Sequence, residues 1–154
     1  MGRVSGPLRV FRVYALTGDR LRLVQAACAI ARLVMIYVPA GELRPLMALE
    51  TAEAWVFGAA PIEAVRSAAE EAWRAAGRRD FDDHGTKVMA PAPTAASFAA
   101  QSVFNRDADL GAVLETLHIL RRTGGLSDEA ARVLLSAVAR AFLPYPPLES
   151  LVPL

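Results

Sequence analysis

The sequence has few of the residue types that do most chemistry: one cysteine, two histidines and, among 17 basic residues, a single lysine. The lone cysteine, Cys28, cannot form a disulfide within the chain, which favours a reducing cytoplasm as the compartment. All basic residues except Lys87 are arginines, and the sequence is rich in alanine. This residue usage is typical of a GC-rich bacterial genome. We therefore expect a bacterial, cytoplasmic protein.

An excess of charge of one sign is also missing. The 17 basic and 16 acidic residues leave a net charge of +1. Binding to the phosphate backbone of nucleic acids draws on clustered positive charge, which this composition does not supply. We expect no nucleic-acid partner.

A signal peptide and a membrane span are not expected either. Arg9 and Arg12 interrupt what would be the apolar region of a signal peptide. The apolar run Leu21–Val38 would measure about 27 Å as a helix, close to the thickness of a bilayer core. However, a central arginine in a membrane costs roughly 2.5–3.5 kcal/mol on insertion scales. The run contains the polar side chains Arg22, Gln25 and Arg32.

What the sequence does contain is helix-forming apolar sequence, with 54% hydrophobic residues and a mean hydropathy of +0.30. In the run Leu21–Val38, Arg22, Gln25, Ala29 and Arg32 fall in one narrow row at helical spacing. A helix that is apolar on its other sides must be covered on most of them. The sequence therefore predicts an all-α, single-domain bundle of five or six helices with a buried central helix at 21–38.

Proline and glycine set the boundaries of the other helices, because proline suits a first helical turn and glycine suits the residue after the last. The hairpin formed by the first two of these helices is expected to be antiparallel, since only three residues separate them. Residues 8–16 are compatible with a helix or a strand, and a helix is favoured because no second strand is evident. The expected helices are Pro45–Phe57, Pro61–Ala76, Thr94–Phe104, Asp109–Thr123 and a last helix capped by Ser127, with a loop at 78–93.

The chain divides into a helical domain, residues 1–143, and an extended tail, residues 144–154. The tail, PYPPLESLVPL, holds four prolines that exclude a helix or an inner strand. We expect its apolar side chains to bind protein, either on the bundle of the same chain or on a neighbouring subunit or partner. The predicted protein-binding residues are Tyr145, Leu148, Leu151 and Val152.

Catalytic and metal motifs are sparse. The loop at 80–84 holds Asp80, Asp82, Asp83 and His84, but a calcium loop begun at Asp80 would have Pro91 where a bidentate glutamate is needed. Cys28 with His84 or His118 could in principle form a nucleophile and base, but no local feature lowers the pKa of the thiol. We predict no catalytic residue, no metal ligand and no cofactor.

One segment, from Ala26 to Ala76, combines alanine-rich helices with a short pattern of other residues. The pattern consists of Ala27-Cys28-Ala29, Arg44-Pro45, Ala48, Glu50, Ala52, Ala54-Trp55, Gly58, Ala68-Ala69 and Ala75-Ala76. On these residues the segment resembles the alanine-rich, all-helical immunity proteins of bacteria. The resemblance implies a small cytoplasmic α-helical protein without catalytic residues that neutralises a toxin. Such proteins tend to have histidines in their later alanine-rich helices, whereas Thr94–Phe104 has none.

These observations favour a non-catalytic helical protein-binding module, either an immunity-type toxin inhibitor or an adaptor in a bacterial assembly. The alternative is a metal-dependent enzyme or a small-molecule binder that uses the acidic loop 80–84. Self-association to a homo-oligomer is also expected, because a chain of this size and hydropathy has more apolar surface than one bundle easily covers.

Overall fold

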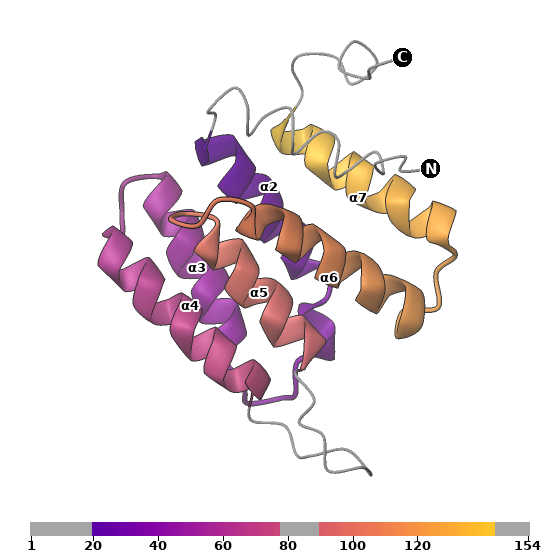
Figure 1. Ribbon diagram of the computed structural model, residues 1–154, viewed down its shortest axis with the longest axis horizontal. Helices are drawn as coiled ribbons and strands as arrows, with labels where there is room; N and C mark the ends of the chain where they lie inside the picture. Colours follow the sequence, from indigo (N-terminus) through magenta and orange to yellow (C-terminus); the bar gives the residue numbers. More distant parts are fainter. Residues whose placement is uncertain (1–19, 78–89, 144–154) are drawn as a thin grey trace.

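The computed structural model describes residues 20–77 and 90–143, and these residues form six α-helices, one short 3₁₀ helix and no strand (Figure 1). The all-α prediction is confirmed. Residues 8–16 and the tail 144–154 lie outside the described residues, as does most of the predicted loop, up to residue 89. The elements are α2 (Arg20–Arg32), η1 (Met35–Tyr37), α3 (Arg44–Val56), α4 (Ile62–Gly77), α5 (Pro91–Gln101), α6 (Ala108–Arg122) and α7 (Asp128–Phe142).

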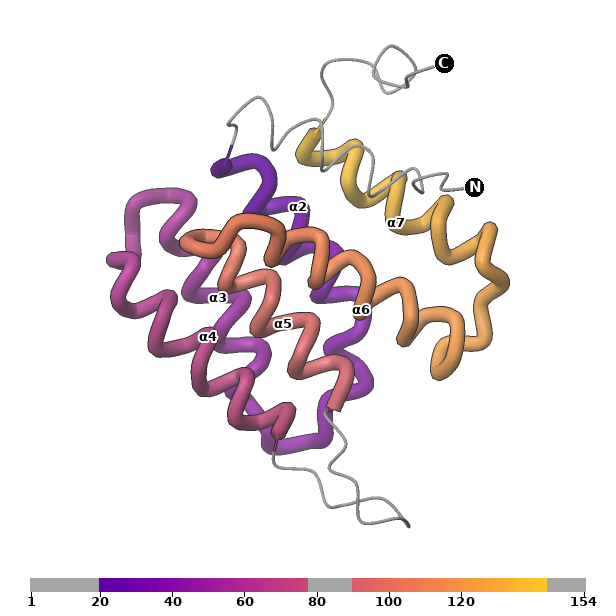
Figure 2. Tube along the Cα trace, in the orientation of Figure 1, coloured from indigo at the N-terminus to yellow at the C-terminus, as the bar shows by residue number. Residues whose placement is uncertain are grey.

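Two helices lie inside the bundle. α5 packs between α4 and α6 and also contacts α3 and α2, as the backbone trace shows (Figure 2). α2 contacts α3, α5, α6 and α7, while α7 lies at the edge against α2 and α6. Eight of the eleven residues of α5 are buried, because alanine, serine and threonine let neighbouring helices approach from several directions. The core is built around α2 and α5 together.

The predicted central helix is shorter than expected. α2 ends at Arg32. After it the hydrogen bonds span three residues instead of four, since the N–H groups of Leu33 and Val34 donate to the carbonyls of Ile30 and Ala31. Pro39 favours an extended conformation at the residue before it, and Val38 has a φ of −79° and a ψ of 134°. The turn buries Val34 while leaving Ile36 exposed.

The predicted start of α5 is also wrong. We expected Pro91 and Pro93 to close a loop and Thr94 to cap the helix, but the helix begins at Pro91. Both prolines occupy its first turn, where backbone N–H groups have no partner within the helix, so nothing is lost by their absence. Thr94 lies inside the helix and its hydroxyl donates to the carbonyl of Ala90 across 2.7 Å.

The other boundaries agree with the sequence to within a few residues. α3 and α4 pack against each other as a hairpin, and Gly58, with a φ of +75°, turns the chain between them. Ser127 caps α7, its hydroxyl oxygen accepting a 3.0 Å hydrogen bond from the N–H of Ala130. Among the helices of the described ranges, none has the length and apolar character to cross a membrane.

Candidate functional site

The outer side of α3 carries a row of exposed apolar side chains. Leu43, Met47, Glu50, Ala54 and Phe57 follow one another at intervals of four, three, four and three residues, which places them along one side of the helix. The exposed fractions are 62% for Leu43, 56% for Met47 and 77% for Phe57. We call these five residues the α3 row.

The opposite side of the same helix supplies the core. Pro45, Ala48, Leu49 and Ala52 are buried where α3 packs on α2, α4 and α5. α3 is therefore apolar on two sides, and the bundle covers only one of them. Single exposed apolar residues are ordinary, but several large ones in one row mark an interaction surface.

The charge of the row comes from Glu50. Its neighbour Glu53 is bound by Arg32 of α2, whose Nε and Nη2 atoms donate to the two carboxylate oxygens across 2.9 and 2.6 Å. This hydrogen bonding raises the pKa of the Arg32 guanidinium. Glu50 is exposed, and within the described part of the chain it takes part in no ion pair. The charge of Glu50 also raises the pKa of Arg32, so the row presents one exposed carboxylate that acts on a nearby guanidinium without forming an ion pair with it.

None of the protein-binding residues predicted from the sequence belongs to the α3 row. Tyr145, Leu148, Leu151 and Val152 fall outside the described residues, and so does the acidic loop 80–84. Their proposed roles stay predictions. Across residues 20–77 and 90–143, no group of three His, Cys, Asp or Glu side chains is placed to hold a metal ion.

Cys28 and His118 differ in their surroundings. Cys28 is fully buried in α2, and this burial, reinforced by the charge of Glu53, raises the pKa of its thiol, while Arg32 acts weakly in the opposite direction. His118 is exposed on α6, one turn after Glu115, a carboxyl whose pKa burial raises. A buried thiol held in its protonated form is a poor nucleophile.

A cavity of about 480 Å³ lies where η1 and the start of α5 meet. Most of its lining is apolar, and its one carboxylate, Glu42, accepts hydrogen bonds from Arg44 at 2.9 and 2.5 Å. A carboxylate held this way is committed to its arginine, so we assign no chemistry to this cavity. The lining residues are Tyr37, Pro39, Glu42, Ala75, Ala90, Pro91, Ala92, Pro93, Ile119 and Thr123.

Comparisons of the chain with protein-family models, with curated proteins and with solved structures found no match. The site must therefore be judged from its own residues. The α3 row was not predicted from the sequence. The regular spacing from Leu43 to Phe57 is the signal that could have revealed it.

Proposed function

We propose that the chain is a non-catalytic protein-binding module and that the α3 row is its docking face. The observation that carries the proposal is the exposure of Leu43, Met47 and Phe57 in one row on a helix whose other side is already packed. Covering such side chains releases about 25 cal/mol for each Å² of apolar surface removed from water. A partner protein provides that cover.

The row also suggests the chemistry of the partner. It runs from Leu43, directly before α3, to Phe57, directly after it. At about 1.5 Å for each step of helix this is about 21 Å, which suits three to four turns of a partner helix with apolar residues at helical spacing. Glu50 lies at its centre and, although its charge acts on Arg32, it forms no ion pair among the described residues. A basic side chain near the middle of the partner helix would complement it, and would add orientation to the apolar contact.

The resemblance to bacterial immunity proteins is compatible with this surface. Two of the residues that carry it, Glu50 and Ala54, belong to the α3 row, whereas Pro45, Ala48 and Ala52 are buried on the other side of α3. An immunity-type inhibitor that captures a toxin, or an adaptor in a bacterial assembly, both fit a docking helix of this kind. A toxin gene beside the gene for this chain would favour the inhibitor over the adaptor.

Self-association remains a separate prediction, and the α3 row is not its best interface. An antiparallel pairing of two copies centred on the row would bring Glu50 against Glu50 of the second copy. Like charges placed opposite one another are destabilising. A partner with a basic residue at that position avoids this cost.

The metal-dependent alternative depends on the loop 80–84. Protein purified without chelators can be analysed for bound metal before and after Asp82 and Asp83 are replaced by asparagine. Stoichiometric metal that disappears in this variant would favour the enzyme or small-molecule alternative over the docking module.

Site-specific photo-crosslinking tests the docking face. A benzophenone amino acid is placed at Met47 and, in a second variant, at Phe57, in the full chain expressed in its native cells. Val133 is the matched control, because it is 63% exposed but lies on α7 among the polar residues Asp128, Glu129, Arg132, Ser136 and Arg140.

We expect positions 47 and 57 to crosslink to the same protein, at a segment with helical apolar spacing and a basic residue. The adduct should be lost when Glu50 is replaced by lysine. Adducts that form equally at position 133, or no adduct at position 47, would contradict the proposal.

A further inference from the structure

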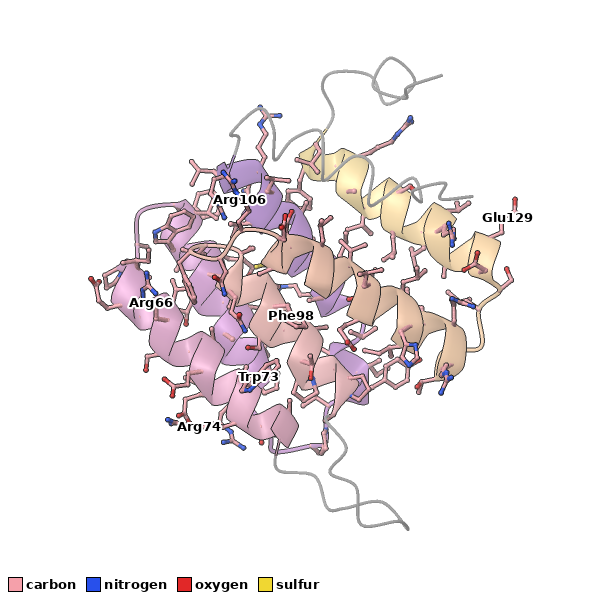
Figure 3. All side chains as sticks on the ribbon, in the orientation of Figure 1. Arg66, Trp73, Arg74, Phe98, Arg106 and Glu129 are labelled. Atoms are coloured by element: carbon pink, nitrogen blue, oxygen red, sulfur yellow. The ribbon has the colours of Figure 1, made fainter. Side chains whose placement is uncertain are left out.

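A second surface, distinct from the α3 row, lies between α4 and α5. It is a groove of about 520 Å³, and Figure 3 shows three of its residues, Arg66, Trp73 and Phe98, on the same side of the bundle. The rings of Trp73 and Phe98 meet edge to face, with centroids 5.8 Å apart and planes inclined by 64°. The groove is lined by Arg66, Ala69, Glu70, Trp73, Phe98, Gln101 and Phe104.

One aromatic wall of the groove lies close to α6. A Cβ atom on Gly111 of α6 would stand 3.0 Å from the Phe98 ring, so the absence of a side chain there makes room for the ring. At the other end of the groove, the Arg66 guanidinium carbon lies 4.4 Å from the centre of the Phe104 ring. This is a cation–π contact, and it fixes the position of a positive charge.

The groove has two charged side chains at its rim, Glu70 and Arg66, and only Glu70 takes part in a salt bridge among the described residues. Glu70, the one carboxylate of the lining, is paired with Arg74 at 2.7 Å, and the same guanidinium also binds Glu71 at 2.5 Å. Arg66, in contrast, contacts the Phe104 ring, and among the described residues it makes no salt bridge. The groove therefore combines an aromatic floor with a cation that is free to bind a carboxylate.

Grooves lined by aromatic residues bind extended proline-rich segments, because such segments are already ordered as polyproline helices and lose little entropy on docking. We propose that this groove binds the proline-rich segment 144–154 of the same chain. This segment holds four prolines and the apolar residues Tyr145, Leu148, Leu151 and Val152, and Glu149 is its one charged side chain. Glu149 pairs with Arg66.

The starting point of the segment is suitable for this path. The segment follows Leu143, a buried residue directly after α7, and α7 ends at the same end of the bundle at which α2 begins (Figure 1). Arg20, the first residue of α2, donates a hydrogen bond to the carbonyl of Ser102, two residues before Phe104 of the groove. At about 3.1 Å for each residue in polyproline geometry, the eleven residues reach about 34 Å, and Glu149, the sixth of them, reaches about 19 Å from Leu143.

Trp73 reports on the groove directly. Replacing Trp55 by phenylalanine leaves Trp73 as the one tryptophan of the chain, since the sequence has two. The emission maximum of Trp73 and its quenching by acrylamide are then compared between the full chain and a chain that lacks Pro146–Leu154. The deletion should move the emission to longer wavelength and increase quenching.

Because a deletion can also disturb folding, a charge exchange gives a second test on the full-length chain. Glu149→Arg should expose Trp73 as the deletion does, whereas Glu149→Arg combined with Arg66→Glu should restore the emission and quenching of the parent. Ser150→Ala is the matched control in the same segment and should change neither. Circular dichroism confirms that the helices remain in each variant.

Two results would overturn the proposal. One is an emission and quenching of Trp73 that are the same in the full chain, the deletion and Glu149→Arg. The other is a protected Trp73 in the full chain that becomes exposed on dilution, since this would show that the segment comes from a second copy. Neither result affects the crosslinks at position 47. The experiments on the groove and those on the α3 row therefore test the two proposals independently.

Discussion

The hydroxyl of Ser97 donates a 2.8 Å hydrogen bond to the backbone carbonyl of Ala69, and so joins α5 to α4 inside the bundle. Both residues are buried. The oxygen of Ser97 also accepts a 3.0 Å hydrogen bond from the side chain of Gln101, a residue of the α4–α5 groove. Small residues bring the two helices close, and this one polar side chain fixes how they sit against each other.

Replacing Ser97 by alanine should lower the free energy of unfolding by about 1 kcal/mol, the typical net contribution of an intramolecular hydrogen bond. Ser67→Ala, at an exposed position of α4, is the control and should change stability by less than about 0.5 kcal/mol. Urea denaturation measures both. Equal effects of the two substitutions would show that the Ser97 hydrogen bond does not stabilise the fold.

Asp109 should make stability depend on pH. Burial, the largest effect, raises the pKa of its carboxyl, the charge of Asp107 acts in the same direction, and Arg20 and two backbone N–H groups oppose them. A pKa that is higher in the folded than in the unfolded chain means that the folded chain binds more protons, so stability falls as pH rises through the folded pKa. One carboxylate oxygen of Asp109 is buried without a hydrogen-bond partner.

Asp109→Asn should therefore raise the free energy of unfolding at neutral pH and reduce its decline with pH. Urea denaturation at a series of values from about pH 4 to 7 measures this, since that interval covers a raised carboxyl pKa. Some slope should persist because burial also raises the pKa of Glu115. A variant less stable than the parent at neutral pH would show that the ionised Asp109 is favourable.

Two glycines should respond differently to alanine. A Cβ atom on Gly124 would stand 2.8 Å from the carbonyl oxygen of Leu120, a backbone atom that also accepts a hydrogen bond from Leu126. Because this backbone cannot move freely, Gly124→Ala should cost about 1–3 kcal/mol. At Gly111 the obstacle is the side chain of Phe98, which can shift toward the groove, and alanine gains up to about 1 kcal/mol of helix propensity.

Gly111→Ala should therefore be tolerated better than Gly124→Ala, and thermal unfolding of the two variants compares them. Equal losses of stability would mean that the Phe98 ring is held as firmly as the backbone carbonyl of Leu120.

Cys28 should be inert in the folded protein, because burial raises the pKa of its thiol and excludes reagents. Ellman's reagent should modify it only as fast as the chain unfolds, and fully in denaturant. A Cys28→Ala, Ser67→Cys variant carries its single thiol at an exposed position and should react at once. If native Cys28 reacted as quickly as this control, a nucleophilic role would need to be considered again.

The sequence predicted the helices better than their packing. Proline and glycine act locally, so Gly58, Pro61 and Ser127 marked boundaries that the structure confirms within a few residues. The end of α2 was missed because apolar residues continue past Arg32, and periodicity alone does not detect a tightened turn. The burial of α5 was missed because hydropathy undervalues small residues, whose role is to let other helices approach.

The candidate sites were harder to predict, for a related reason. On α3, apolar residues occupy both the side with Leu49 and the side with Met47, and composition does not tell which of them the bundle covers. The α4–α5 groove forms between segments about thirty residues apart, and Trp73 and Phe98 meet only after the chain has folded. Contacts of this kind have no local signature in the sequence.

The most direct test of the docking face is the affinity for the protein that crosslinks at position 47, measured by isothermal titration calorimetry. Met47→Glu should weaken binding at least about tenfold, which corresponds to about 1.4 kcal/mol, and leave the thermal midpoint unchanged, since Met47 is exposed. Val133→Glu, which alters a side chain on α7 that is 63% exposed against 56% for Met47, should bind as the parent does. If Met47→Glu binds as tightly as the parent chain, the α3 row is not where the partner docks.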